Sequence, residues 1–245
     1  MARTISVAVG AGVLGVLAGA AAGARVDLTS AGSSGSLAGQ VGGTALFQWV
    51  DQQTTGTGVI EPFVRLQNNG TEEGYNSSGN LSGTWSDVKA GTWTHDLQLK
   101  DVPIVNGHYQ FLLDINQNKG GDSELLSLEN VKIYIGDTGG KTGALNTLGT
   151  LAWSMKSSDD VKLNFALNPG SGAGDMFMYI PVADLGSDDS KFVYLYSHFG
   201  KSYATNDGIE EWSVFGPHTA VPLPAAAGMG MLGLLAVVGI RRLRP

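Results

Sequence analysis

Val161-Lys162-Leu163-Asn164-Phe165-Ala166-Leu167 alternates apolar side chains with polar or small ones along its whole length. Successive side chains of a β-strand point to opposite faces of the sheet. The odd positions of this segment would therefore share one apolar face, while Lys162 and Asn164 would point to water. Such a period of two predicts a half-buried β-strand.

Two other segments repeat this alternation, which extends the prediction from one strand to a sheet. Residues 109–115 place Asp114 on the polar side, and residues 131–135 do the same with Tyr134. The dipeptide Asn106-Gly107 comes shortly before the first of these segments. A type I′ turn needs positive φ at both central residues, which Asn-Gly adopts readily, so a β-hairpin is predicted there.

Short segments of similar composition recur along the chain, separated by clusters of Gly, Asn, Asp and Ser. The further candidate strands cover residues 45–50, 62–66, 94–100, 175–182, 192–199 and 209–215. No long stretch of the sequence has the period of 3.6 that marks an amphipathic helix. We therefore predict an all-β fold, an antiparallel β-sandwich of jelly-roll type. Residues 29–43 and 67–83 contain few bulky side chains and are predicted to be exposed or flexible loops.

Composition limits the classes of function. The chain has 15 Lys and Arg residues, 22 Asp and Glu residues, no Cys, and a formal net charge of −7. That charge becomes −11 for the body of the chain once four terminal arginines, Arg3, Arg241, Arg242 and Arg244, are left out. Nucleic acid is an unsuitable partner for such an acidic body. The lack of Cys excludes disulfides, thiol catalysis and thiolate metal sites.

The end of the chain combines a proline motif, an apolar run and an arginine cluster. The motif Val221-Pro222-Leu223-Pro224 is followed by 16 residues from Ala225 to Ile240, and then by the cluster Arg241, Arg242 and Arg244. A membrane-spanning helix needs about 20 apolar residues, so this run is short for a permanent anchor. Arginines remain on the cytoplasmic side, which would leave everything before the motif outside. The tail therefore predicts a transiently inserted transmembrane helix, with an ordinary C-terminal anchor as the alternative.

Residues 221–245 resemble the PEP-CTERM sorting signal of Gram-negative bacteria, which joins a short proline motif, one transmembrane stretch and a terminal arginine cluster. The usual third motif residue is Glu, and this chain has Leu223, so it carries a Val-Pro-Leu-Pro variant. The resemblance implies processing by an exosortase-type enzyme after transient anchoring in the inner membrane. It also implies a final place on the outer surface or in the extracellular matrix, beside extracellular polysaccharide.

The N-terminus has the pattern of a secretory signal peptide. Arg3 forms a small basic region, residues 7–22 form an apolar region, and Ala22-Gly23-Ala24 forms an A-x-A cleavage site before Arg25. Residues 1–24 are therefore predicted to be removed by cleavage after Ala24. The body that remains, residues 25–218, is predicted to be a single β-sandwich domain.

Parts of this body are similar to blocks found in exported PEP-CTERM proteins without assigned activity. These blocks are residues 112–117, 125–129, 170–176, 194–200 and 210–212. The class has no catalytic residues to carry over, so the resemblance implies a location and no reaction.

Oxygen-bearing side chains occupy alternate positions of one turn-prone segment: Asp114, Asn116, Asn118 and Asp122. Ca²⁺ takes six to eight oxygen ligands, and EF-type loops use positions 1, 3, 5 and 9 in this way. An EF-hand itself is excluded, because Lys119 stands where Gly is required and Leu125 where a bidentate Glu belongs. A looser calcium site in a β-loop is not excluded, and these four residues are its candidate ligands; the favoured interpretation is a polar turn whose side chains cap their own backbone.

Aromatic side chains along residues 192–199 suggest a surface that stacks on sugar rings. Tyr194 and Tyr196 lie on one face of this predicted strand, and Trp212 is the third candidate. The opposite face of the strand is also apolar. The alternative is therefore a central strand covered by protein on both faces.

No catalytic constellation is evident in the sequence. Glu210 and Glu211 are neighbours on a predicted strand and would point to opposite faces, so they cannot flank one glycosidic bond. Nucleophile-elbow, zinc-helix and phosphate-loop motifs are also missing from the sequence. We predict a non-enzymatic, exported surface or matrix protein of structural or interaction type. The alternative is a carbohydrate-binding module, assisted by calcium.

Overall fold

A computed structural model describes residues 23–50, 60–170, 172 and 174–214. The apolar part of the predicted leader and the tail from Val221 to Arg244 lie outside these residues. None of the helices in the described part of the chain has the length and apolar composition needed to cross a bilayer. The prediction of a terminal membrane helix therefore falls on residues that are not described.

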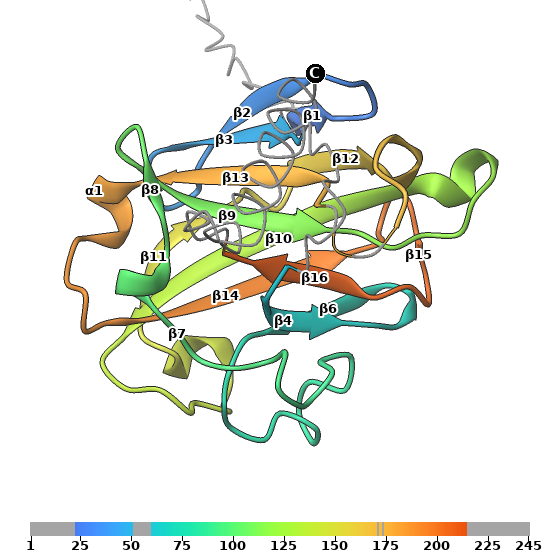
Figure 1. The fold of residues 1–245 in the computed structure, drawn as a ribbon. Helices are drawn as coiled ribbons and strands as arrows, with labels where there is room; N and C mark the ends of the chain where they lie inside the picture. The colour runs from blue at the N-terminus through green and yellow to red at the C-terminus, as the bar shows by residue number, and fades with distance from the viewer. Residues whose placement is uncertain (1–22, 51–59, 171, 173, 215–245) are drawn as a thin grey trace, which may run out of the picture.

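The described chain forms two large β-sheets and a small third one (Figure 1). The first sheet has the order β1 (Arg25–Asp27), β12 (Asp160–Asn164), β10 (Leu125–Gly136), β14 (Phe192–Phe199) and β6 (Glu72–Tyr75), with β11 (Thr150–Ser154) on β10 and β7 (Leu97–Gln98) on β14. The second has the order β2 (Ser34–Ala38), β3 (Thr44–Trp49), β13 (Met176–Pro181), β9 (His108–Asp114), β16 (Glu210–Ser213) and β4 (Pro62–Leu66), with β8 (Ile104–Val105) on β9. The small sheet pairs β5 (Asn69–Gly70) with β15 (Thr205–Asn206).

Helices are short and lie in the connections. They are α1 (Val182–Leu185) and the 3₁₀ turns η1 (Leu99–Asp101), η2 (Gly121–Glu124), η3 (Leu145–Thr147) and η4 (Phe165–Leu167). All strand pairs are antiparallel except β1 with β12, where Arg25 lies opposite Asp160 in a parallel pair. The predicted all-β, largely antiparallel sandwich is therefore confirmed at the level of its sheets.

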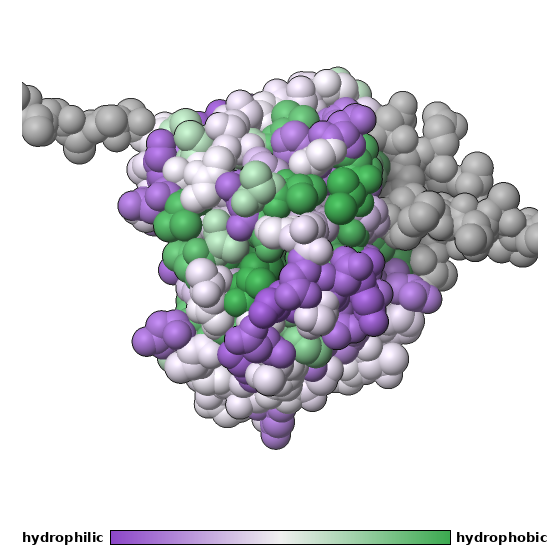
Figure 2. All heavy atoms as spheres, turned by 90° about the vertical axis from the view of Figure 1, so that its left-hand side faces the viewer, coloured by the Kyte–Doolittle hydropathy of each residue, from purple (hydrophilic) through white to green (hydrophobic). Residues whose placement is uncertain are grey.

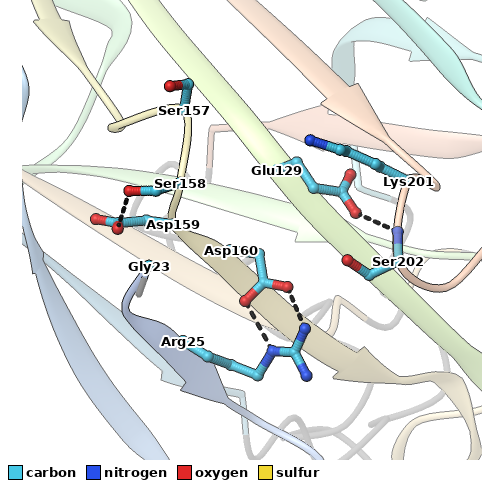
Figure 3. A pocket seen from close by; sticks show the side chains of 9 residues that line it. All are labelled: Gly23, Arg25, Glu129, Ser157, Ser158, Asp159, Asp160, Lys201 and Ser202. Carbon is cyan, nitrogen blue, oxygen red and sulfur yellow. Dashed lines mark hydrogen bonds and ion pairs between the residues drawn. The ribbon is translucent and has the colours of Figure 1, made fainter. Parts of the chain in front are cut away.

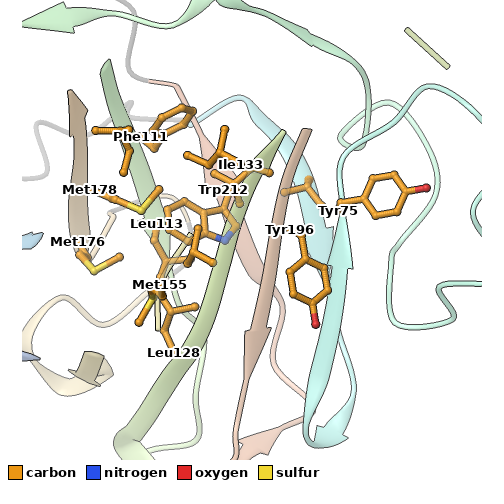
Figure 4. Close-up of a cluster of buried hydrophobic side chains, with 14 of the residues drawn as sticks. Tyr75, Phe111, Leu113, Leu128, Ile133, Met155, Met176, Met178, Tyr196 and Trp212 are labelled. Atoms are coloured by element: carbon orange, nitrogen blue, oxygen red, sulfur yellow. The ribbon is translucent and has the colours of Figure 1, made fainter. Parts of the chain in front are cut away.

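The space between the two sheets is filled by apolar side chains from both (Figure 4). Trp212 of β16, Phe111 of β9 and Ile133 of β10 are fully buried there. The indole N–H of Trp212 donates to Ser197 Oγ on β14, at 3.1 Å, and so joins the two sheets. Burial of large side chains in this layer stabilises the sandwich by about 25 cal/mol per Å² of apolar surface.

Aromatic rings cover the outer face of the first sheet. Tyr75 and Tyr196 lie on the far side of their strands from Trp212 (Figure 4). Tyr75 makes edge-to-face contacts with Trp85 at 5.4 Å and with Tyr194 at 6.2 Å between ring centroids. Trp85 also meets Tyr196, at 5.8 Å. Because Trp85 comes from the irregular segment after β6, this segment closes over the sheet and buries the tyrosines.

Several sequence predictions agree closely with the strands. Residues 62–66 and 192–199 are β4 and β14 with the same bounds. Asn106 and Gly107 have φ of 49° and 77°, as the predicted turn requires, and they join β8 to β9. The alternative interpretation of β14 is also confirmed, because it lies between β10 and β6 and nearly all of its residues are buried.

Other predictions were wrong. The segment 161–167 is a strand only to Asn164, whose side chain accepts a hydrogen bond from Ala166 N at 2.9 Å and starts the turn η4. Tyr134, predicted to face water, is only 6% exposed. The predicted loops 29–43 and 67–83 contain β2 and the pair β5 and β6. Polar composition alone therefore concealed three strands.

On the face that carries α1 and β8, an apolar area lies next to a hydrophilic one (Figure 2). Ile104 and Val105, at the tip of the β8–β9 hairpin, are 57% and 36% exposed. The opposite end of β9 is different, because its last residue, Asp114, is a buried carboxylate.

Candidate functional site

Five acidic side chains gather where β9 ends and where β6, β13 and β16 begin. They form what we call the carboxyl cluster: Glu72, Asp114, Asp175, Glu210 and Glu211. None of them is more than 8% exposed, and Glu210 is completely buried. Acidic residues are almost never buried unless they are paired, so the cluster needs a physical explanation.

Glu72 and Glu210 form the centre of this cluster and come from different sheets. Their carboxyl groups lie within hydrogen-bonding reach of each other. Glu72 Oε2 accepts the amide of Asn68 at 2.9 Å, whereas Glu72 Oε1 and Glu210 Oε2 receive no hydrogen bond from the described chain. Two carboxyl groups facing each other need a proton or a cation between them, since two bare carboxylates repel.

Gln117 completes the central group. Its Nε2 donates to Glu210 Oε1 at 2.6 Å, and the amide of Asn116 approaches the same oxygen at 3.4 Å. Gln117 is 5% exposed, and its Oε1 has no hydrogen-bond partner in the described chain. Three buried oxygens, from Glu72, Gln117 and Glu210, are therefore left without a donor.

Asp114 and Asp175 hold the loop before β13. Asp114 Oδ2 and Oδ1 accept the amides of Gly172 at 2.7 Å and Gly174 at 3.1 Å. Asp175 Oδ2 accepts the amide of Ile115 at 2.8 Å, while its Oδ1 has no hydrogen bond. Charged acceptors of this kind bind backbone amides strongly, so the two aspartates fix the end of β9 against the start of β13.

The cluster has little positive charge to balance it. Arg65 of β4 pairs with Glu211 at 2.7 Å. Within the described residues, Glu72, Asp175 and Glu210 form no ion pair with Lys, Arg or His. An uncompensated carboxylate is costly in a low-dielectric interior, so these three groups favour either protonation or a bound cation.

Burial shifts the pKa values of the cluster in the same direction. Loss of hydration, together with the neighbouring Glu210, raises the pKa of Glu72 to about 11. Burial also raises the pKa of Glu210, and it raises that of Asp175 well above the ordinary range. The pKa of Glu211 is raised by burial, although Arg65 opposes this change. The ionised cluster is thus unfavourable when only protein groups surround it.

The structure corrects the predicted calcium site. Both oxygens of Asp114 accept amides of the 172–174 region, and Asp122 is exposed in η2. The backbone of Asn116 faces Glu210, and that of Asn118 donates to the side chain of Asn206. No three Asp, Glu or His side chains in the described part of the chain are arranged to hold a metal ion. The four predicted residues therefore do not form one set of ligands, because Asp114 is buried against the 172–174 region while Asp122 is exposed.

The predicted glycan-stacking residues are also corrected. Tyr194 and Trp212 are 0% exposed and Tyr196 is 5% exposed, so none offers a ring face to a sugar. The hydroxyl of Tyr196 donates to Glu73 Oε2, which fixes the ring beneath the segment that carries Trp85. Sequence alternation identified the shared face but could not reveal that another segment covers it.

Three of the sequence blocks described above contribute residues to the carboxyl cluster. Residues 112–117 contribute Asp114 and Gln117, residues 170–176 contribute Asp175, and residues 210–212 contribute both glutamates. Glu72 was missed, because it stands in a polar segment interpreted as a loop. No sequence pattern identifies Glu72 as part of the cluster, because its contact with Glu210 of the other sheet forms only in the folded protein.

A second polar site lies beside the edge strand β1 (Figure 3). This cavity has a volume of about 320 Å³ and charged or small polar walls. Arg25 donates two hydrogen bonds to Asp160, at 2.8 and 2.5 Å. Ala24, the predicted cleavage residue, donates its amide to Asp159 Oδ1 at 2.9 Å and accepts the amide of Asp160 at 3.1 Å. The backbone of Ala24 thus already pairs with the body.

Comparisons with protein-family models, with curated proteins and with solved structures found no match.

Proposed function

We propose that the chain is an exported, non-enzymatic protein of structural or interaction type that resides on the outer surface or in the extracellular matrix of a Gram-negative bacterium. The observation that carries this proposal is the order of the segments. The sandwich strands run from Arg25 to Ser213, between the predicted leader and the PEP-CTERM-like tail. A folded body bordered by an export signal and a sorting signal suits a processed exosortase substrate.

The finer fold and processing belong to the same proposal. The chain crosses repeatedly between the two sheets, at β1 to β2, β4 to β6, β7 to β8, β9 to β10, β12 to β13, β13 to β14 and β14 to β16, which fits a jelly-roll-like path. The leader is removed after Ala24. The tail is held in the inner membrane by residues 225–240 and Arg241, Arg242 and Arg244, and is then cut near Val221-Pro222-Leu223-Pro224.

The closed nature of the carboxyl cluster supports a function without catalysis. General acid–base catalysis needs a carboxyl group within reach of a substrate. Glu72, Asp175 and Glu210 have exposed fractions of 1%, 3% and 0%, so their raised pKa values occur where no soluble substrate reaches. These groups fit a structural role.

The C-terminus of the native protein provides the test. Mass spectrometry of protein isolated from the cell surface should show that the residues after the proline motif have been removed. Replacing Arg241, Arg242 and Arg244 with alanine should leave unprocessed protein. Native surface protein that retains the intact tail would contradict exosortase-type processing and favour a plain anchor.

Carbohydrate binding is the alternative, and the cavity beside β1 is the feature that favours it. Its walls combine Arg25, Asp160, Lys201 and several serines, which can donate to and accept from sugar hydroxyls. An Arg25→Ala variant should then lose affinity on a glycan array. No binding by the unmodified protein would remove this alternative.

A further inference from the structure

We propose that Glu72, Gln117 and Glu210 form an internal binding site for a hard divalent cation, with Ca²⁺ as the favoured ion. The site lies between the two sheets and differs from the calcium site predicted from the sequence. It would join a carboxylate of β6 in one sheet to a carboxylate of β16 in the other.

The first observation is the number of buried oxygens that lack a donor. Glu72 Oε1, Gln117 Oε1 and Glu210 Oε2 all have no hydrogen-bond partner in the described chain. A proton shared by the two carboxyl groups would satisfy at most two of these oxygens. The amide oxygen of Gln117 carries no proton and would remain unsatisfied, whereas one cation can accept all three as ligands.

The second observation is the mutual placement of these three side chains. Gln117 Nε2 binds Glu210 Oε1 at 2.6 Å, and Glu210 lies within hydrogen-bonding reach of Glu72. The other oxygen of Glu72 is fixed by the amide of Asn68 at 2.9 Å. The backbone and Gln117 thus hold the two carboxylates in place, leaving one oxygen of each without a protein donor.

The chemistry of the donors selects the ion. All three are oxygens, and hard cations such as Ca²⁺ and Mg²⁺ prefer carboxylate and carbonyl ligands. Ca²⁺ tolerates irregular coordination, while Mg²⁺ demands near-ideal octahedral geometry, so a site built from two strands and a loop favours Ca²⁺.

Charge balance gives independent support. Glu72 and Glu210 have no basic partner in the described chain, and the two sheets bring them together in a completely buried position. A divalent ion would neutralise both carboxylates at once and link the two sheets. The proposed export does not enter this inference, so failure of either proposal leaves the other standing.

Calcium titration of the full chain, purified in mild detergent and first stripped with a chelator, tests the site. Weak calcium sites in proteins bind with Kd of about 10⁻⁴–10⁻³ M, so about 10 mM Ca²⁺ should raise Tm by about 3–10 °C. Glu72→Gln and Glu210→Gln should each abolish this rise. The matched control is Asp122→Asn, which alters an exposed residue of the sequence-predicted set and should retain the full rise.

Terbium provides a measurement that does not depend on the variants folding. Tb³⁺ replaces Ca²⁺, and its emission is sensitised by a nearby indole. Trp212 follows Glu210 by two residues on the same strand. Tb³⁺ bound to the unmodified chain should therefore emit on excitation of tryptophan, and Ca²⁺ should displace it. The proposal would be overturned if calcium did not change the Tm of the unmodified chain. It would also be overturned if calcium still raised the Tm of both glutamate variants.

Discussion

The middle of strand β16 and its first residue lie two positions apart and occupy opposite chemical environments. Trp212 is packed among apolar side chains between the sheets, whereas Glu210 faces a second carboxyl group. Both are 0% exposed. Burial of Trp212 therefore stabilises the fold through apolar contacts. Burial of Glu210 destabilises it unless a proton or a cation neutralises the carboxylate.

The largest expected effect concerns the apolar end. Trp212→Ala should lower the free energy of unfolding by about 3–5 kcal/mol, because a large buried ring is replaced by a cavity. It also removes the hydrogen bond to Ser197 that joins the sheets. Urea denaturation measures the loss. Trp93→Ala is the control, since Trp93 is 41% exposed and should change stability by less than about 0.5 kcal/mol. Equal losses in both variants would contradict the proposed core.

A smaller effect is expected in the loop that Asp114 holds. Gly174 has φ of 71°, and a Cβ there would lie 2.6 Å from a methyl group of Leu112. Gly174→Ala should therefore cost about 2–3 kcal/mol through backbone strain and overpacking. Gly170→Ala is matched, because Gly170 also has positive φ but open space around it, so it should cost only the strain. Equal losses would mean that the contact with Leu112 is unimportant.

In the carboxyl cluster, a substitution should increase the stability of the protein instead of lowering it. In calcium-free buffer, Glu72→Gln should raise the free energy of unfolding by about 1 kcal/mol, since it removes one of two facing carboxyl groups and preserves the side-chain shape. Denaturant unfolding at neutral pH measures the change. Glu73→Gln serves as the control, because Glu73 points to the other face and binds Tyr196. A loss of stability in the Glu72 variant would show that the facing pair is favourable without a cation.

The smallest effect concerns a largely buried pair of opposite charges, Glu129 and His198, which contrasts with the like-charged carboxyl cluster. Glu129 and His198 approach to 3.7 Å, a distance that permits an ion pair but no hydrogen bond. The contact with Glu129 raises the pKa of His198 above 6.5, although burial opposes it. Burial would raise the pKa of Glu129, but interactions with His198, Ser127 and backbone amides lower it below 4.5.

These directions define a pH window. The contribution of His198 is complete below pH 6.5 and is lost as the pH rises through its raised pKa. That of Glu129 is present above pH 4.5 and is lost as the pH falls through its lowered pKa. The difference in stability between the unmodified chain and His198→Gln should therefore be greatest between these values. A difference that is constant from pH 4 to pH 8 would contradict the pair.

Local sequence patterns predicted a strand correctly where the surroundings of that strand in the fold match its own pattern of apolar and polar residues. Residues 192–199 were recovered with their bounds, because both faces of β14 are apolar along most of its length. Asn106-Gly107 was recovered because φ is a local property. Glu210 and Glu211 were also placed correctly on different faces, since Glu210 meets Glu72 while Glu211 pairs with Arg65.

Features that depend on distant segments could not be predicted. Glu72 is polar and lies in a polar segment, and no local pattern reveals its contact with Glu210, which is 138 residues away in the sequence. The strand pattern alone could not show what covers Tyr194 and Tyr196, because their ring contacts come from Tyr75 and Trp85 in other segments. Asp114 stood in a plausible ligand pattern, but a loop 58 residues further on supplied the amides that bind it.

If residues 1–24 are removed as proposed, the pairing of Ala24 with the edge of the sandwich would link this cleavage to local charge. While a leader is attached, Ala24 meets Asp159 as a neutral amide. Hydrolysis after Ala24 would instead create an α-ammonium group on Arg25, the neighbour of that amide and the partner of Asp160. The proteolytic cut would thus supply a new cation to an acidic edge, so the mature strand would be held electrostatically in a way that the precursor is not.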